Sequence, residues 1–109
     1  MAKHPIDKLF ATIVARKGAD PATSYTAQLL KAGVARCAKK FGEEAVEAAI
    51  AGALEDKHAL ASESADALYH LLVLWAASGI TPAQVYAALA KREGRSGLAE
   101  KAARKKNRP

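Results

Sequence analysis

The sequence predicts an all-α fold, a small bundle of about five helices. Half of the 109 residues are hydrophobic but only 6% are aromatic, and alanine is the most frequent residue, a composition that favours helices over β-sheets. Apolar residues recur at three- and four-residue intervals, and no segment of strand length alternates between apolar and polar residues. A chain of this length has room for one domain with its own core.

The first two helices are predicted from apolar spacing and from capping residues. Pro5 suits a helix start, and apolar residues follow at helical spacing, which predicts a helix over residues 5–16: Ile6, Leu9, Phe10, Ile13 and Val14. Gly18 and Pro21 interrupt this pattern. Ser24 is a candidate N-cap for a short second helix that ends at Gly33.

The remaining helices are predicted over residues 34–54, 57–78 and 82–93. Thr81, Pro82 and Gln84 form a capping-box start for the last of them. The C-terminal half of the helix over 57–78 is apolar on nearly every side. A chain this small is not expected to cover all those sides, so a second subunit is predicted to complete the bundle as a homodimer.

The net charge of +6 is concentrated at the C-terminus. Residues 1–94 carry 11 Lys and Arg against 10 Asp and Glu, whereas residues 95–109 carry six against one. We therefore expect a helical domain over 1–94 and a basic tail over 95–109, and no nucleic-acid partner. The tail could bind the phosphates of a ligand or be a solvated chain end.

Cysteine content and hydropathy indicate the compartment. Cys37 is the only cysteine, which excludes a disulfide or a cysteine-based zinc site within one chain. The N-terminal MAKHPIDKLF lacks the pattern of a secretory signal, and the longest apolar run, residues 71–77, is too short to cross a bilayer. We expect a soluble cytoplasmic protein with no membrane partner.

Four carboxylates are predicted to meet between two neighbouring helices. Glu44 and Glu47 are three residues apart, as are Glu63 and Asp66, so each pair shares a helix face. Residue 55 lies midway between 47 and 63 and midway between 44 and 66, inside the predicted turn. In an antiparallel hairpin the four acids therefore reach one level, roughly 12 Å from the turn.

A cluster of four carboxylates on a partly apolar surface calls for a compensating cation. All four donors are oxygens, which favours Mg²⁺, or Mn²⁺, over zinc or copper. Taken by spacing alone, the acids could instead form a solvated surface.

Four stretches carry a family resemblance: SYTAQLL (24–30), KKFGEEAVEAAIA (39–51), ESADALYHLLVLWA (63–76) and SGLAEKAARK (96–105). In this order, over nearly the whole chain, they resemble the phosphoribosyl-ATP pyrophosphatase family of the all-α NTP pyrophosphatase (MazG-like) superfamily. The acidic signature is shared with the wider superfamily, whereas the last two stretches are more specific.

The resemblance implies Mg²⁺-dependent hydrolysis of phosphoribosyl-ATP to phosphoribosyl-AMP and pyrophosphate, the second step of histidine biosynthesis. The metal ligands would be Glu44, Glu47, Glu63 and Asp66, and the catalytic carboxylates would be Glu43, Glu44 and Glu47. For Glu43 a surface pair with Lys39 or Lys40 ranks above a second metal or a bound water. The alternatives are a house-cleaning nucleoside triphosphate pyrophosphatase and a non-enzymatic helical assembly module.

Substrate-binding residues are predicted around the acids and in the tail. Lys40 and His70 each lie four residues from a predicted ligand on the same helix face, although His70 could equally be a core or interface residue. Tyr25 opens a helix, whose N-terminal amides favour phosphate. The cations Arg95, Lys101 and Arg104 belong to or adjoin the family-like tail stretch. Core or interface positions are expected for three aromatic residues: Phe41, Tyr69 and Trp75.

Overall fold

The computed structural model describes residues 4–93 together with residues 97, 101 and 104. Over residues 4–93 it contains five helices and no strand: α1 Pro5–Ala15, α2 Tyr25–Ala32, α3 Val34–Ala53, α4 Lys57–Ser78 and α5 Pro82–Ala90. The predicted all-α class is confirmed, and the first four helices agree with the prediction to within one residue at each end. The fifth ends at Ala90, before the predicted residue 93, and residues 91–93 form a turn.

The helix starts are set by the predicted capping residues. The Ser24 hydroxyl accepts a hydrogen bond from the Ala27 amide at 3.1 Å, which caps α2. The Thr81 hydroxyl accepts one from the Gln84 amide at 3.4 Å, and the Gln84 side chain accepts one from the Thr81 amide at 2.8 Å, completing the predicted capping box. These bonds satisfy amides that have no partner inside the first turn of a helix.

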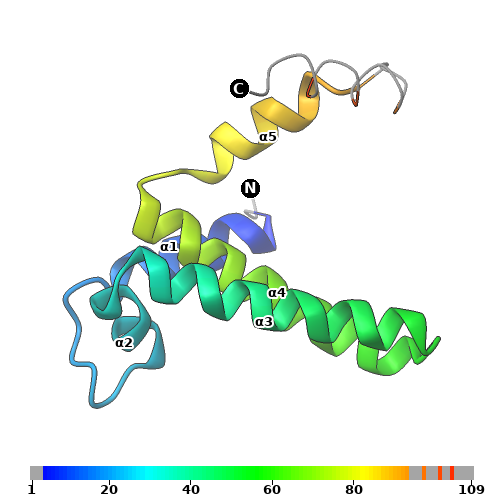
Figure 1. The fold of residues 1–109 in the computed structure, drawn as a ribbon. Coiled ribbons are helices and arrows are strands. Elements are labelled where there is room, and N and C mark those ends of the chain that lie inside the picture. The colour runs from blue at the N-terminus through cyan, green and yellow to red at the C-terminus, as the bar shows by residue number, and fades with distance from the viewer. Residues whose placement is uncertain (1–3, 94–96, 98–100, 102–103, 105–109) are drawn as a thin grey trace.

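Helices α3 and α4 form a long antiparallel hairpin, as Figure 1 shows. The turn between them contains Glu55 at φ 58°, a left-handed conformation, and lies where the sequence predicted it. Asp56 caps α4 by accepting a hydrogen bond from the Ala59 amide at 3.0 Å. The position of this turn fixes which residues of the two helices lie opposite each other.

The core lies at the end of the hairpin away from the turn, where α1 and α2 pack against α3 and α4 (Figure 1). Its buried side chains come from all four helices: Ile13, Leu29, Cys37, Leu72, Val73 and Ala76. Leu72 and Val73 are fully buried within the single chain. One side of the apolar half of α4 is therefore covered by α1, α2 and α3, whereas Leu68 stays 45% exposed and Leu71, Leu74 and Trp75 are partly exposed. That a second subunit covers the remaining sides stays a prediction.

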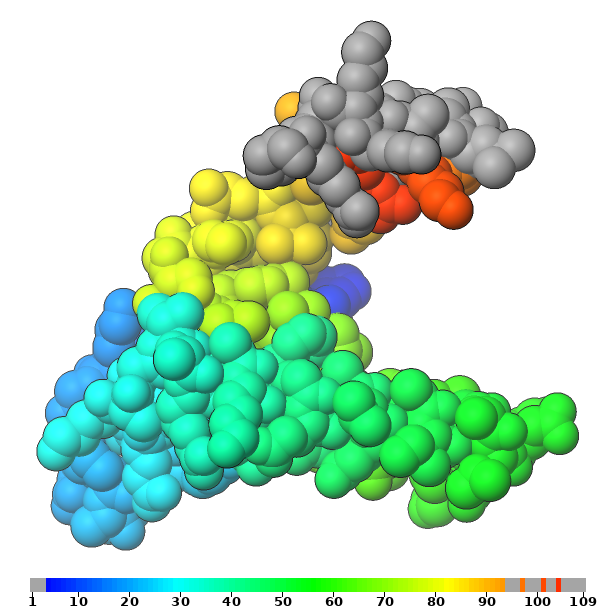
Figure 2. All heavy atoms as spheres, in the orientation of Figure 1, coloured from blue at the N-terminus to red at the C-terminus, as the bar shows by residue number. Residues whose placement is uncertain are grey.

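Large apolar side chains are exposed at several places on the described helices, and three of the most exposed lie on α3. Val46, Ile50 and Leu54 follow one another at four-residue intervals and are 58%, 54% and 74% exposed. Figure 2 shows the α3–α4 hairpin, in green, extending to one side of the molecule beyond α1 and α2. We call these three residues the α3 stripe.

Helix α5 turns away from the hairpin after Gly79, whose φ of 78° ends α4 (Figure 1). The hydroxyl of Tyr86 on α5 donates a hydrogen bond to Asp7 on α1 at 3.1 Å. Among the described residues, no single helix is both long and apolar enough to span a membrane; α4 and α5 meet that criterion only as a pair bent by 109°.

Candidate metal centre

Three of the four predicted ligands converge between α3 and α4. Glu44 from α3 and Glu63 and Asp66 from α4 each offer a carboxylate oxygen, and these oxygens all lie within 4.8 Å of one another. The three-residue spacing places Glu63 and Asp66 on one face of α4, and the turn at Glu55 brings Glu44 to their level. The sequence predicted this convergence from the same two facts.

Glu47, the fourth predicted ligand, lies beside the other carboxylates but on an exposed part of α3. Partial burial raises the pKa of Glu44, and hydrogen bonding with Glu47 and repulsion by Glu47 and Asp66 raise it further. The pKa of Glu63 is raised by desolvation and then by the same two neighbours. Four acids thus share one small region, and each negative charge disfavours the next.

One oxygen of this cluster has no partner. The Oε2 atom of Glu63 is buried and makes no hydrogen bond within the described chain. A buried carboxylate oxygen without a donor is costly, and a cation would satisfy it. The donor set consists of carboxylate oxygens and therefore fits Mg²⁺ or Mn²⁺.

His70 lies at the inner edge of the carboxylate cluster. It is only 6% exposed, and its Nε2 atom is 4.0 Å from Oε1 of Glu44. Its Nδ1 atom is buried without a hydrogen-bond partner. Burial, and then the positive charge of Lys40, lower the pKa of His70. A neutral imidazole beside Glu44 can donate or accept a hydrogen bond.

Lys40 lies one helical turn before Glu44 on α3. Its ammonium nitrogen is 3.6 Å from Oε2 of Glu43, so the surface pair that ranked first for Glu43 is present. The charge of the same ammonium group offsets part of the rise in the pKa of Glu44. Lys40 is therefore positioned to bind an anionic ligand, such as a phosphate group, at the carboxylate cluster.

Tyr25, at the start of α2, belongs to an aromatic group beside His70. Its ring stacks on Tyr69 with centroids 6.5 Å apart and meets the edge of His70 at 6.0 Å. Tyr69 in turn meets His70 at 5.0 Å, and its hydroxyl is hydrogen-bonded to that of Thr26. The sequence assigned Tyr69 to the core or an interface and did not connect it with Tyr25. The bond between Thr26 and Tyr69 joins residues 43 positions apart, for which no local pattern exists.

The predicted cations of the tail are described only in part. Lys101 and Arg104 are exposed and have helical backbone, whereas Arg95 lies outside the described residues. Substrate binding by these three residues stays a prediction.

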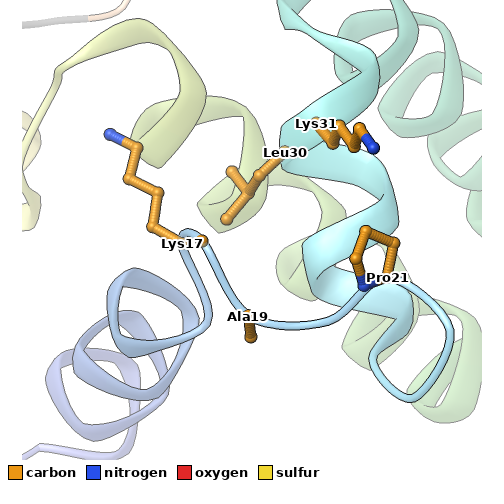
Figure 3. A pocket seen from close by; sticks show the side chains of 6 residues that line it. Lys17, Ala19, Pro21, Leu30 and Lys31 are labelled. Carbon is orange, nitrogen blue, oxygen red and sulfur yellow. The ribbon is translucent and has the colours of Figure 1, made fainter.

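A separate pocket of about 370 Å³ lies between the α1–α2 connection and α2, and none of the predicted site residues lines it. Figure 3 shows Lys17 and Lys31 at its rim with their ammonium groups directed away from each other. These two charges do not converge on one anion, so the pocket is not the candidate site.

Comparison with known proteins decides the family. The profile of the family described as phosphoribosyl-ATP pyrophosphohydrolase matches residues 6–93. The chain belongs to the phosphoribosyl-ATP pyrophosphohydrolase family. This membership confirms the resemblance found in the sequence, and all four carboxylates fall inside the matched region.

Individual members of the family match over nearly the whole chain. The phosphoribosyl-ATP pyrophosphatase of Azospirillum brasilense is 62% identical over 92% of this chain and 90% of its own length. Those of Parvibaculum lavamentivorans and Rhodospirillum rubrum are 63% and 56% identical, over 91% and 93% of this chain and 91% and 86% of their own lengths.

Proposed function

We propose that this chain hydrolyses phosphoribosyl-ATP to phosphoribosyl-AMP and pyrophosphate, the second step of histidine biosynthesis, and that the reaction depends on Mg²⁺. Family membership supports the substrate, since the relatives are named for it. The observation that carries the metal dependence is the convergence of Glu44, Glu63 and Asp66 within 4.8 Å, with a buried, unpartnered oxygen on Glu63.

In this proposal Glu44, Glu47, Glu63 and Asp66 hold the Mg²⁺, or Mn²⁺ in its place. When bound, the ion supplies positive charge that neutralises phosphate oxygens and stabilises the pyrophosphate leaving group. The reaction adds a water oxygen to the α-phosphorus and breaks its bond to the oxygen that bridges to the β-phosphorus. That oxygen leaves as part of pyrophosphate.

The protein's own residues position and charge-balance the substrate. Lys40 lies one helical turn before Glu44 on the same face of α3, so its ammonium group can contact phosphate oxygens held at the acids. Glu43 positions Lys40 through their 3.6 Å ion pair, so the role we assign to Glu43 is that of a positioning residue. His70, whose Nε2 atom lies 4.0 Å from Oε1 of Glu44, is placed to contact the substrate beside the acids.

We also propose that the basic tail over 95–109 contributes Arg95, Lys101 and Arg104 to recognition of the substrate's phosphates. The excess of positive charge in this segment supports that role. In this proposal the metal centre belongs to the helical domain over residues 1–94.

We infer a homodimer that works in the cytoplasm. The α3 stripe supports it: three large apolar side chains on one helix face are each more than half exposed in the single chain, and a second copy would cover them. Val46 and Ile50 flank Glu47 along the chain, so such an interface would adjoin the metal centre.

The direct test is a pyrophosphate-release assay with phosphoribosyl-ATP, with and without Mg²⁺, run beside a panel of ordinary and damaged nucleoside triphosphates. We expect release from phosphoribosyl-ATP only when Mg²⁺ is present. Preference for the other triphosphates would identify a house-cleaning pyrophosphatase. A folded protein that is inert toward every substrate and binds no divalent metal would be a helical assembly module.

A further inference from the structure

The ring of Tyr25 is exposed beside the metal centre although the residues around it are packed. Tyr25 is 48% exposed, yet Tyr69 stacks against it and His70 meets it edge-on. Centroid separations of 6.5 and 6.0 Å lie within the range of favourable aromatic pairs. The ring is therefore supported from within the protein while much of it faces solvent.

The surroundings of Tyr25 are ordered by a cap at the start of α2 and by a bond from α2 to α4. The Ser24 hydroxyl caps α2 directly before Tyr25, and the Thr26 hydroxyl directly after it is hydrogen-bonded to the hydroxyl of Tyr69. These bonds order the backbone on both sides of Tyr25 and the Tyr69 ring on which Tyr25 stacks, so a ligand that packs on Tyr25 meets an ordered support. Tyr25 is thus suited to bind a flat partner.

The metal centre begins immediately beyond His70. The centroid of the His70 ring is 6.0 Å from that of Tyr25, and its Nε2 atom is 4.0 Å from Oε1 of Glu44. A ligand with phosphates at the carboxylate cluster therefore has an aromatic surface one side chain away. The phosphates would meet the bound cation and Lys40, whereas the phenyl ring of Tyr25 offers an apolar face that suits a heteroaromatic ring better than an anion.

We propose that Tyr25 is a specificity-determining residue that stacks on the purine base of the nucleotide, with Tyr69 and His70 supporting its ring. This inference rests on the proposed function, because it takes the substrate to be an adenine nucleotide. It replaces the phosphate contact that the sequence suggested for this residue with a base contact. The base would fix the orientation of the substrate, and the carboxylates would hold its phosphates.

The test compares the wild type with Tyr25→Leu and Tyr25→Phe. Competitive inhibition of phosphoribosyl-ATP hydrolysis is measured with two probes: ATP carrying a methylene group between the α- and β-phosphorus atoms, which cannot be hydrolysed there, and inorganic tripolyphosphate, which has no base. We expect Tyr25→Leu to weaken the nucleotide about 5- to 150-fold, the range of base–aromatic stacking, and to leave tripolyphosphate within about 2-fold. Tyr25→Phe, which keeps the ring, should resemble the wild type.

The kinetic constants give a second readout. Stacking made equally in the bound substrate and the transition state predicts a raised KM for phosphoribosyl-ATP in Tyr25→Leu, with kcat nearly unchanged. Equal weakening of both probes would overturn the proposal in favour of a phosphate contact. Unchanged inhibition would overturn it as well, and so would a change of mass in light scattering, since the ring would then belong to a contact between copies.

Failure of the proposed function would look different. A wild type that does not hydrolyse phosphoribosyl-ATP but binds the methylene nucleotide, measured directly by calorimetry, more weakly after Tyr25→Leu would refute the substrate and support the stacking. A wild type that hydrolyses phosphoribosyl-ATP with an unaltered KM in Tyr25→Leu would refute the stacking alone.

Discussion

Replacing Asp66 by asparagine tests the metal centre at an exposed ligand. Asp66 is exposed, and its carboxylate oxygen lies within 4.8 Å of those of Glu44 and Glu63. In bulk water, two unit charges about 4 Å apart attract by about 1 kcal/mol, so a divalent cation and one carboxylate attract by about 2 kcal/mol. The bulk value applies because Asp66 faces solvent, and it corresponds to a loss of about 30-fold in Mg²⁺ affinity.

Isothermal titration of the metal-free protein with Mg²⁺ measures this loss. Glu55→Gln is the matched control, because it removes one negative charge from the same hairpin at the turn. Residue 55 is 11 positions from residue 66 along the chain, a rise of roughly 16 Å on a helix and beyond the screening length of about 10 Å at 0.1 M salt. We expect the control to bind Mg²⁺ within about 2-fold of the wild type.

Two further readouts separate a metal ligand from a structural residue. Asp66 repels Glu44 and Glu63, as the raised pKa of each indicates, so metal-free Asp66→Asn should be at least as stable to heat as the wild type. Its Mg²⁺-dependent turnover should fall at least about 100-fold, because the ion is worth several kcal/mol in the transition state. Wild-type Mg²⁺ affinity in Asp66→Asn, or an equal loss in Glu55→Gln, would refute the assignment.

Three other substitutions or reagents test the packing. Leu72→Ala removes a fully buried side chain and should lower the free energy of unfolding by about 3 kcal/mol, and Tm by roughly 10–20 °C. Leu68→Ala, at a residue 45% exposed, should lower this free energy by less than half as much. Equal losses in the two variants would contradict the core described above. The Cys37 thiol, 1% exposed with its pKa raised by burial, should react with a thiol reagent about 100-fold more slowly in the native than in the denatured protein, and equal rates would show that it is accessible. Ile50→Lys should convert the proposed dimer to a folded monomer in light scattering, and an unchanged mass would exclude the α3 stripe as the interface.

The helices and the acidic level could be predicted because both depend on local information. Apolar spacing and the caps at Ser24 and Thr81 act within one or two turns of a helix, and those caps form as expected. The meeting of Glu44 with Glu63 and Asp66 depends only on helical geometry and on the turn at Glu55 between them. An antiparallel hairpin carries that information over twenty residues without any knowledge of the rest of the fold.

The cover of α4 could not be predicted in this way. Apolar periodicity indicates that the C-terminal half of α4 is buried, but it does not identify which helix packs on each side. The prediction from sequence was therefore a second subunit. Helices α1 and α2 cover one side of it, where Ile13 and Leu29 share a core cluster with Leu72 and Val73, whereas Leu68 on α4 stays 45% exposed. Which helix packs on an apolar face depends on the path of the loops and on the fit of side chains across them.

The sequence by itself thus determined the helix set, the turn at residue 55 and the level of the four carboxylates, because each follows from contacts between residues close along the chain or mirrored about one turn. Tertiary structure alone decided that His70 is buried against Glu44, that one oxygen of Glu63 has no partner among the described residues, and that Tyr25 lies against Tyr69 and His70. Those relations depend on how α2 crosses the hairpin, which is set by packing among side chains far apart in the sequence. The positions of the metal-binding carboxylates follow from local sequence, whereas the surface proposed to bind the nucleotide base forms only when the chain folds.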